Sequence, residues 1–183
     1  TKAKLLGGYG VNRISMGVQS LEADLLDRLG RVHSREMVFK SYDTLRAAGF
    51  ENINLDLMFA IPGQTLEVWR ETLREALAMG SEHISSYEVI YEEDTPLYTQ
   101  LKAGEFEVNE DLACEMYEQL VAATTVAGLE QYEIANFARP GGGLQKQSAP
   151  VVTSGPPLPF RAGLHHVTSR RRWSPARTGP HGP

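Results

Sequence analysis

Apolar residues recur with period two in several short stretches of the chain and with a helical period in the stretches between them. The clearest alternation lies in residues 52–65, NINLDLMFAIPGQT. Aliphatic positions alternate there with three others: Ile53, Leu55 and Leu57 with Asn54, Asp56 and Met58. Period-two spacing indicates a strand with one aliphatic face and one polar face. Asp56 lies in the middle of this strand, where a carboxylate must be hydrogen-bonded or lose its charge.

The rest of the pattern predicts three more strands and five helices. The strands fall at residues 11–18, 84–91 and 131–138, and the helices at residues 21–29, 34–48, 66–79, 96–103 and 109–127. This order predicts parallel strands with right-handed crossovers. Four strands do not close a barrel, and a parallel sheet needs cover on both faces. We therefore predict an α/β fold in which residues 1–141 form the later part of a partial (β/α) barrel.

Charge divides the chain at about residue 141. All 23 acidic residues lie in the first 140 positions beside 12 of the 18 basic ones, which gives this part a net charge of −11. The remaining 43 residues contain six basic residues, no acidic residue, seven prolines and seven glycines. Such a composition is typical of segments that do not fold, so residues 142–183 are expected to form a disordered basic tail.

Two features restrict the class of protein. The chain has no apolar run long enough to span a bilayer and no signal-peptide pattern at its start, which favours a cytoplasmic protein. Cys114 is its only cysteine, so the chain can build neither a disulfide nor a cysteine-held metal site, and a packed structural thiol is expected. The run from Arg170 to Trp173 could contact nucleic acid, but a single basic run is rarely specific.

Candidate binding residues follow the predicted strands. The carboxyl ends of parallel strands share one crevice, where Gln19, Arg31, Asp56, Met58 and Ile90 are expected to converge. Arg31 could hold a carboxylate with two donors, Asp56 and Gln19 could hold a diol, and the two apolar side chains could flank an aromatic base. This set suits a zwitterionic, hydroxylated ligand. The alternative is a structural ion pair between Arg31 and Asp56, with Gln19 satisfying a loop.

Five motifs in order resemble one family over about residues 10–141: GVNRISMGVQS, LGRVHS, NINLDLMFAIPGQT, HISSYEVIYEEDTPLY and QYEIANFARPG. They are similar to the radical S-adenosylmethionine (SAM) proteins related to oxygen-independent coproporphyrinogen III oxidase, and most of all to their HemW-type haem chaperone branch. The resemblance implies a radical SAM barrel. It also implies that Arg31 contacts the methionine carboxylate of SAM, that Gln19 and Asp56 bind its ribose, and that Met58 and Ile90 line its adenine.

The sequence departs from the family pattern in two places. The family holds a 4Fe–4S cluster with three closely spaced cysteines that precede the matched region, and these cysteines are absent here. We therefore expect a catalytically silent fragment of a radical SAM oxidoreductase-like protein. After residue 141 the family continues with a histidine-containing run associated with haem binding, and His165 and His166 do not match that run.

A shifted reading frame would explain the second departure. Codons for residues 143–148, read one base later, permit a Cys-Arg-Asn-Asn-Leu-like string close to the family's continuation, and codons for residues 155–163 permit a glycine-rich string. The alternative is a genuine disordered extension.

The resemblance implies a haem chaperone in haem and porphyrin metabolism. Its expected ligands are S-adenosylmethionine, haem or a porphyrinogen, with haem-accepting proteins as candidate partners. Coproporphyrinogen III dehydrogenase activity is the main alternative. A non-enzymatic haem carrier and a nucleic-acid-binding tail are weaker ones.

Overall fold

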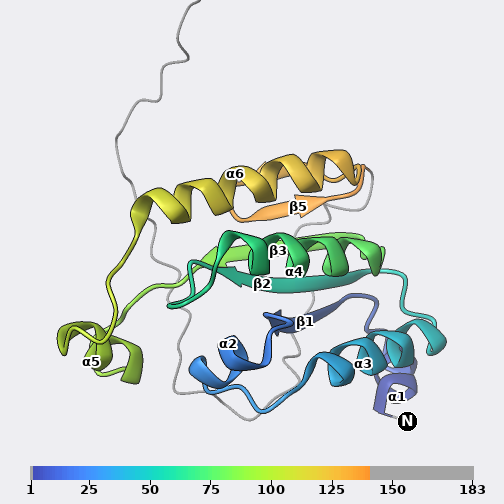
Figure 1. The fold of residues 1–183 in the computed structure, drawn as a ribbon. Coiled ribbons are helices and arrows are strands. Elements are labelled where there is room, and N and C mark those ends of the chain that lie inside the picture. Colours follow the sequence, from blue (N-terminus) through green and yellow to red (C-terminus); the bar gives the residue numbers. More distant parts are fainter. Residues whose placement is uncertain (1, 141–183) are drawn as a thin grey trace, which may run out of the picture.

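The predicted strand within residues 52–65 forms an inner strand of a five-stranded sheet (Figure 1). The computed structural model describes residues 2–140. Its strands are β1 (Ile14–Gln19), β2 (Ile53–Phe59), β3 (His83–Glu88), β4 (Glu130–Glu133) and β5 (Asn136–Ala138). Their order in the sheet is β1-β2-β3-β5-β4. The first three are parallel, β5 is antiparallel to β3, and β4 is antiparallel to β5.

Six helices precede or connect the strands in the described part of the chain. They are α1 (Lys2–Gly8), α2 (Ala23–Arg28), α3 (Arg35–Ala47), α4 (Leu66–Ala78), α5 (Pro96–Lys102) and α6 (Glu110–Val126). Four begin at side chains that accept a hydrogen bond from a backbone N–H of the first turn: Ser34, Thr65, Thr95 and Asn109. The boundaries thus lie within a few residues of those predicted.

The last predicted strand is wrong in both shape and direction. Residues 131–138 form a hairpin, β4 and β5, instead of one strand, and the hairpin joins the sheet antiparallel to β3. The third predicted strand is also shorter than residues 84–91. Its partner β2 ends at Phe59, whose carbonyl oxygen accepts the N–H of Val89 at 3.1 Å, and the chain then leaves the sheet. Ile90 therefore lies beyond the strand.

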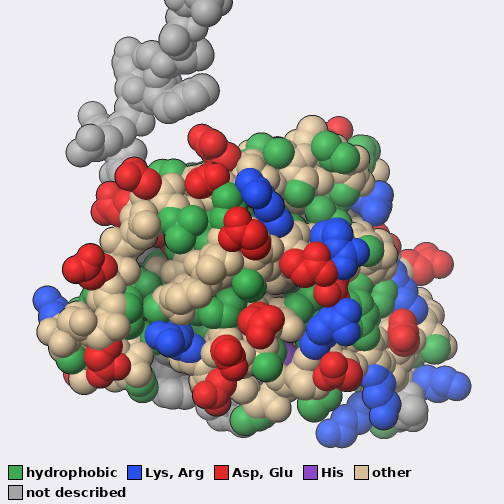
Figure 2. Space-filling view, in the orientation of Figure 1, with side chains coloured by type: hydrophobic (Ala, Val, Ile, Leu, Met, Phe, Trp, Pro, Cys, Tyr) green, Lys and Arg blue, Asp and Glu red, His purple; other side chains and the backbone are tan. Residues whose placement is uncertain are grey.

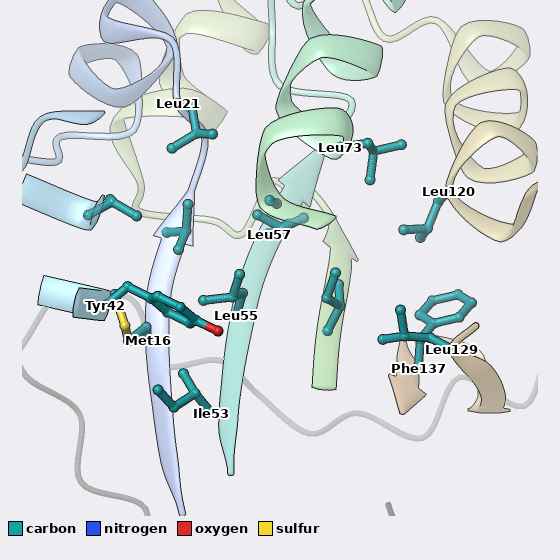
Figure 3. Close-up of a cluster of buried hydrophobic side chains, with 14 of the residues drawn as sticks. Met16, Leu21, Tyr42, Ile53, Leu55, Leu57, Leu73, Leu120, Leu129 and Phe137 are labelled. Carbon is teal, nitrogen blue, oxygen red and sulfur yellow. The ribbon is translucent and has the colours of Figure 1, made fainter. Parts of the chain in front are cut away.

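One face of the sheet is covered by α3, α4 and α6. The predicted aliphatic row of β2 is fully buried there, in one apolar cluster with side chains of the helices and with Phe137 of β5 (Figure 3). The indole N–H of Trp69 on α4 donates to the carbonyl oxygen of Met116 on α6 at 2.8 Å, which fixes the two helices to each other. The other face carries the polar row of β2, so the predicted alternation is confirmed.

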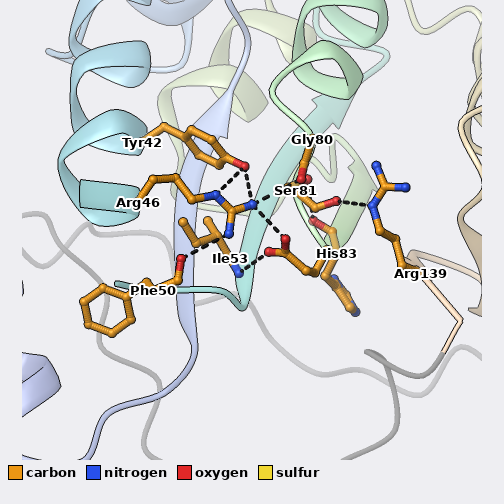
Figure 4. Close-up of polar contacts among 9 residues, drawn as sticks. Tyr42, Arg46, Phe50, Ile53, Gly80, Ser81, His83 and Arg139 are labelled. Carbon is orange, nitrogen blue, oxygen red and sulfur yellow. Dashed lines mark hydrogen bonds and ion pairs between the residues drawn. The ribbon is translucent and has the colours of Figure 1, made fainter. Parts of the chain in front are cut away.

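Arg46 on α3 joins three segments at the amino ends of β2 and β3 (Figure 4). Its guanidinium donates to the carbonyl oxygens of Phe50 and Gly80, at 3.1 Å each. It also donates to Oε1 of Glu82 at 2.8 Å, while Oε2 of Glu82 accepts the N–H of Ile53 at 3.0 Å. Arg46 thus hydrogen-bonds both the loop after α3 and the loop before β3, and Glu82 links it to the first residue of β2.

The visible surface over the helices mixes charges of both signs (Figure 2). Arg35 on α3 pairs with Glu75 on α4 at 2.6 Å, and Arg74 pairs with Glu71 within α4. Interspersed charges of this kind are typical of a solvated face rather than of a nucleic-acid-binding surface. The predicted tail, residues 142–183, lies outside the described residues.

Candidate functional site

Asp56 lies on the polar face of β2 and is held by two neutral donors. Its Oδ2 accepts the hydroxyl of Ser15 on β1 at 2.7 Å, and its Oδ1 accepts the amide of Asn54 at 2.7 Å. Burial raises the pKa of Asp56, and these two hydrogen bonds act in the opposite direction. The Asp56 carboxylate is thus hydrogen-bonded, one of the two outcomes that the sequence predicted, and neither of its donors is a cation.

Gln19 reaches the same face through an irregularity in β1. The pairing of β1 with β2 shifts between Gly17 and Gln19, and Gln19 has a φ of 63°. Its amide nitrogen lies 2.9 Å from the point that a Cβ atom on Gly17 would occupy, so the side chain folds back over the glycine. Gly17 is the register partner of Asp56. The structure therefore brings the Gln19 amide and the Asp56 carboxylate to neighbouring strands on one face.

Arg31 lies in a loop that is attached to the end of β1. Its N–H donates to the carbonyl oxygen of Leu26 at 2.8 Å, and Nε2 of His33 lies 3.0 Å from the carbonyl oxygen of Val18. The Nε atom of Arg31 is buried and has no hydrogen-bond partner among the described residues. Burial lowers the pKa of Arg31.

The alternative interpretation of Arg31 as a structural partner of Asp56 is wrong. The ion pairs within residues 2–140 are Arg35–Glu75, Arg46–Glu82 and Arg74–Glu71. A guanidinium that is partly withdrawn from water without a carboxylate is costly, so this group is available to an anionic ligand.

Met58 and Ile90 differ in their surroundings. Met58 is half-buried and packs against a small apolar cluster under the loops that follow β2 and β3: Leu25, Ile61, Val89 and Leu97. Ile90 directly follows a member of this cluster in sequence, but its own side chain is 66% exposed. The two residues thus lie at the carboxyl ends of their strands, and convergence of all five candidates on one ligand stays a prediction.

The sequence pattern did not single out a group of polar side chains beside Asp56. His83 on β3 pairs in register with Asn54, and its imidazole contacts the side chains of Asn54 and of Tyr132 on β4. Burial, aided by the charge of Arg13, lowers the pKa of His83 to about 4. One signal in the sequence could have identified His83, namely its period-two spacing with Ser85. The contact with Tyr132 depends on the hairpin, which the sequence did not predict.

The described residues do not provide the ligands of a metal cluster. Within residues 2–140 no group of three or more histidine, cysteine or acidic side chains could hold a metal ion. Cys114 is exposed on α6, so the expectation of a packed thiol is wrong. The buried positions of α6 are taken by Ala113, Met116, Leu120 and Thr124, which turns the thiol outward. By contrast, the chemistry of Arg31, a donor, suits a carboxylate, and that of Asp56, an acceptor, suits sugar hydroxyls. Binding of S-adenosylmethionine by these residues stays a prediction.

Sequence comparison places the chain among known proteins. Residues 1–76 match the family model described as Radical SAM superfamily. The protein named heme chaperone HemW from Bacillus subtilis is 44% identical over 141 residues, which is 76% of this chain and 37% of that protein. HemW from Lactococcus lactis is 37% identical over 139 residues, again 37% of its length. The chain therefore spans well under half of these relatives.

A mouse relative extends the match. Radical S-adenosyl methionine domain-containing protein 1, mitochondrial, from Mus musculus is 34% identical over 176 residues, or 96% of this chain and 38% of that protein. A match of this extent includes most of residues 142–183, so the expectation that similarity ends near residue 141 is wrong for this relative. A shifted frame after residue 143 stays a prediction.

Solved structures show the same architecture. Coproporphyrinogen III oxidase (HemN) from Escherichia coli, a radical SAM enzyme, matches 76% of this chain and 32% of its own with a TM-score of 0.67 at 23% identity. Elp3 from Methanocaldococcus infernus matches 67% of this chain and 29% of its own with a TM-score of 0.58 at 26% identity. The predicted α/β fold with parallel strands, similar to that of a radical SAM enzyme, is confirmed for β1 to β3. That these strands are the later part of a barrel stays a prediction.

Fold and sequence together define a class. Over the matched residues the chain belongs to the radical SAM superfamily. Within that class it is a HemW-type protein over the residues that it shares with these relatives. Within residues 2–140, the helices are too short or too polar to cross a membrane.

Proposed function

We propose that the protein is a haem chaperone of the HemW type, and that the residues described here bind the amino-acid and ribose parts of S-adenosylmethionine. One observation carries the ligand assignment. The partly buried guanidinium of Arg31 has an Nε atom without an acceptor among residues 2–140, and its loop is attached to the same strand that presents Gln19 beside Asp56. An arginine in this state is satisfied by a carboxylate, and a carboxylate such as Asp56 is satisfied by sugar hydroxyls.

The remaining binding capacity of Asp56 supports this assignment. A carboxylate offers about four acceptor positions, of which Ser15 and Asn54 use two. Two ribose hydroxyls can donate to the others. Met58 packs against the apolar cluster at the strand ends, and exposed Ile90 directly follows Val89 of that cluster in sequence, so the two are the proposed apolar contacts for the adenine. These residues would hold and orient the nucleoside of S-adenosylmethionine, which when bound would supply radical chemistry in a full-length protein that carries the cluster.

Haem is the proposed cargo and a porphyrinogen the alternative ligand. Support for haem comes from the 44% identity to a protein named heme chaperone, compared with 23% identity to coproporphyrinogen III oxidase. Haem-accepting proteins are then the proposed partners. A cytoplasmic location is proposed because HemW of Bacillus subtilis is more similar to the chain than the mouse mitochondrial relative is. Titration of the full-length protein with haem, followed by its absorption spectrum, should show saturable binding, whereas turnover of coproporphyrinogen by that protein with no haem binding would contradict the chaperone assignment.

Arg31→Gln tests the ligand assignment directly. We expect calorimetric titration of the 183-residue chain to show about tenfold weaker binding of S-adenosylmethionine, because a charge-assisted pair with the carboxylate is lost. 5′-Methylthioadenosine has no amino-acid carboxylate, so its affinity should not change. Arg28→Gln, an exposed arginine in the last turn of α2, is the matched control. Equal losses for both ligands, or none for either, would contradict the assignment.

Gly17→Ala tests the position of the Gln19 amide. The new methyl group would lie 2.9 Å from the amide nitrogen, so the flexible side chain must move away from the Asp56 face. We expect about three- to fivefold weaker binding of both S-adenosylmethionine and 5′-methylthioadenosine, since each contains the ribose. In a Gln19→Ala background the same substitution should have no further effect. Gly7→Ala, with open space around the new atom, is the control.

A further inference from the structure

A chain of hydrogen bonds runs from the β4–β5 hairpin to Asp56. The hydroxyl of Tyr132 on β4 contacts Nε2 of His83, and Nδ1 of His83 contacts Oδ1 of Asn54. The amide nitrogen of Asn54 donates to Oδ1 of Asp56 and to the hydroxyl oxygen of Ser15, at 2.7 Å each. Residues far apart in the sequence therefore meet on one face of the sheet.

We call this series of hydrogen bonds, from Tyr132 through His83 and Asn54 to Asp56, the relay. Each of its donors points toward Asp56. The amide nitrogen of Asn54 faces two oxygen atoms, so its carbonyl oxygen must face His83 and the proton of the neutral imidazole must be on Nδ1. Nε2 of His83 is then an acceptor, and the Tyr132 hydroxyl donates to it. Aligned hydrogen bonds polarise one another, so each strengthens the next toward Asp56.

We propose that Asn54, His83 and Tyr132 are positioning residues that orient Asp56 for the ribose, so that the Tyr132 hydroxyl on the β4–β5 hairpin raises the affinity of Asp56 for its ligand. The proposal rests on the ligand assignment made above. It extends that assignment to a hairpin that follows β3 by more than forty residues and whose side chains need not touch the ligand.

The burial of the polar side chains in the relay indicates that they do more than fill space between the strands. His83 is 2% exposed and Tyr132 is 37% exposed, so the relay links a buried imidazole to the surface of the hairpin. Their rings meet edge to face, with centroids 5.4 Å apart. A buried polar chain is costly unless every member is paired, and here each nitrogen of His83 has a partner. Removal of the Tyr132 hydroxyl should therefore change the hydrogen bonding of the Asp56 carboxylate.

Tyr132→Phe tests the proposal because it removes one hydroxyl and keeps the ring. In the 183-residue chain we expect about three- to tenfold weaker binding of both S-adenosylmethionine and 5′-methylthioadenosine. Tyr117→Phe is the matched control. The Tyr117 hydroxyl donates to the carbonyl oxygen of Ile134 at 3.1 Å and accepts the amide of Gln131 at 2.6 Å, so it supports the same hairpin outside the relay.

Nuclear magnetic resonance supplies a readout that does not need a ligand. The nitrogen shifts of His83 should show a proton on Nδ1, and Tyr132→Phe should move the Nε2 signal and the carboxyl carbon signal of Asp56. Tyr117→Phe should move neither. A proton on Nε2 in the wild-type chain, or an Asp56 signal unaffected by Tyr132→Phe, would overturn the relay.

Asp56→Asn separates the two proposals. If this variant binds S-adenosylmethionine as the wild type does, the ligand assignment fails. If Asp56→Asn weakens binding but Tyr132→Phe does not, the assignment stands and the relay is overturned. If Tyr132→Phe weakens binding equally in the presence and absence of the Asp56 carboxylate, the effect does not pass through Asp56 and the relay is again overturned. The expected result is a loss in the wild-type background that disappears in Asp56→Asn.

Discussion

Replacement of Arg46 by methionine is expected to lower the free energy of unfolding by about 2–4 kcal/mol. Methionine keeps much of the apolar stem but removes every donor. The carbonyl oxygens of Phe50 and Gly80 then lose a partner, and the Glu82 carboxylate loses its cation. The pair is about one quarter exposed, so water recovers part of the loss and the estimate lies below that for a fully buried pair.

Urea unfolding followed by the emission of buried Trp69 measures this effect, in a Trp173→Phe background that leaves one tryptophan. Arg74→Met is the matched control, because Arg74 pairs with Glu71 across an exposed turn of α4 and should not change the transition measurably. Glu82→Gln should cause a smaller loss than Arg46→Met, because an amide oxygen can still accept the N–H of Ile53. Equal midpoints for Arg46→Met and Arg74→Met would contradict this account.

Much of the fold could be predicted because its signals are local. The aliphatic row of β2 has period two, and the helix starts at Ser34, Thr65, Thr95 and Asn109 are encoded by single side chains within one turn. The polar position of Asp56 in that row also predicted that its carboxylate would be hydrogen-bonded, which Ser15 and Asn54 confirm.

The hairpin could not be predicted in the same way. Residues 131–138, QYEIANFA, alternate as one strand would, and the reversal at Ile134 and Ala135 contains no glycine or proline. What fixes the reversal is tertiary: the N–H of Ser86 donates to the carbonyl oxygen of Ala135 at 2.8 Å, and Ser85 donates to the side chain of Asn136. A pattern within eight residues does not contain these contacts.

The candidate site shows the same division. The parallel order of the strands predicted that Gln19 and Asp56 would lie near neighbouring strand ends, but the irregularity between Gly17 and Gln19 was not predicted. The Arg31 Nε atom without a partner among residues 2–140 and the contact between His83 and Tyr132 depend on which strands and loops become neighbours. Those relations arise from the sheet order, so the relay behind Asp56 became visible only in the structure.

The second large effect is a loss of stability in mild acid that is due to His83. Its pKa is about 4 in the folded protein and 6.5 in its ordinary state, because the buried imidazole resists a charge. Its contribution to stability is therefore complete above pH ~6.5 and is lost as the pH falls toward ~4, where the folded protein also takes up the proton. The loss should reach at most about 3 kcal/mol.

Asp56 should act in the opposite direction, and this distinguishes the two groups. Burial raises its pKa, so the folded protein takes up a proton at Asp56 before the unfolded chain does, and acid relieves the cost of the buried charge. We expect His83→Gln to flatten the fall in unfolding free energy between pH ~6.5 and ~4, and Asp56→Asn to steepen it. Urea transitions at a series of pH values measure both slopes. If the unfolding free energy of His83→Gln falls with pH as steeply as that of the wild type, the imidazole is not the group that makes the folded protein sensitive to acid.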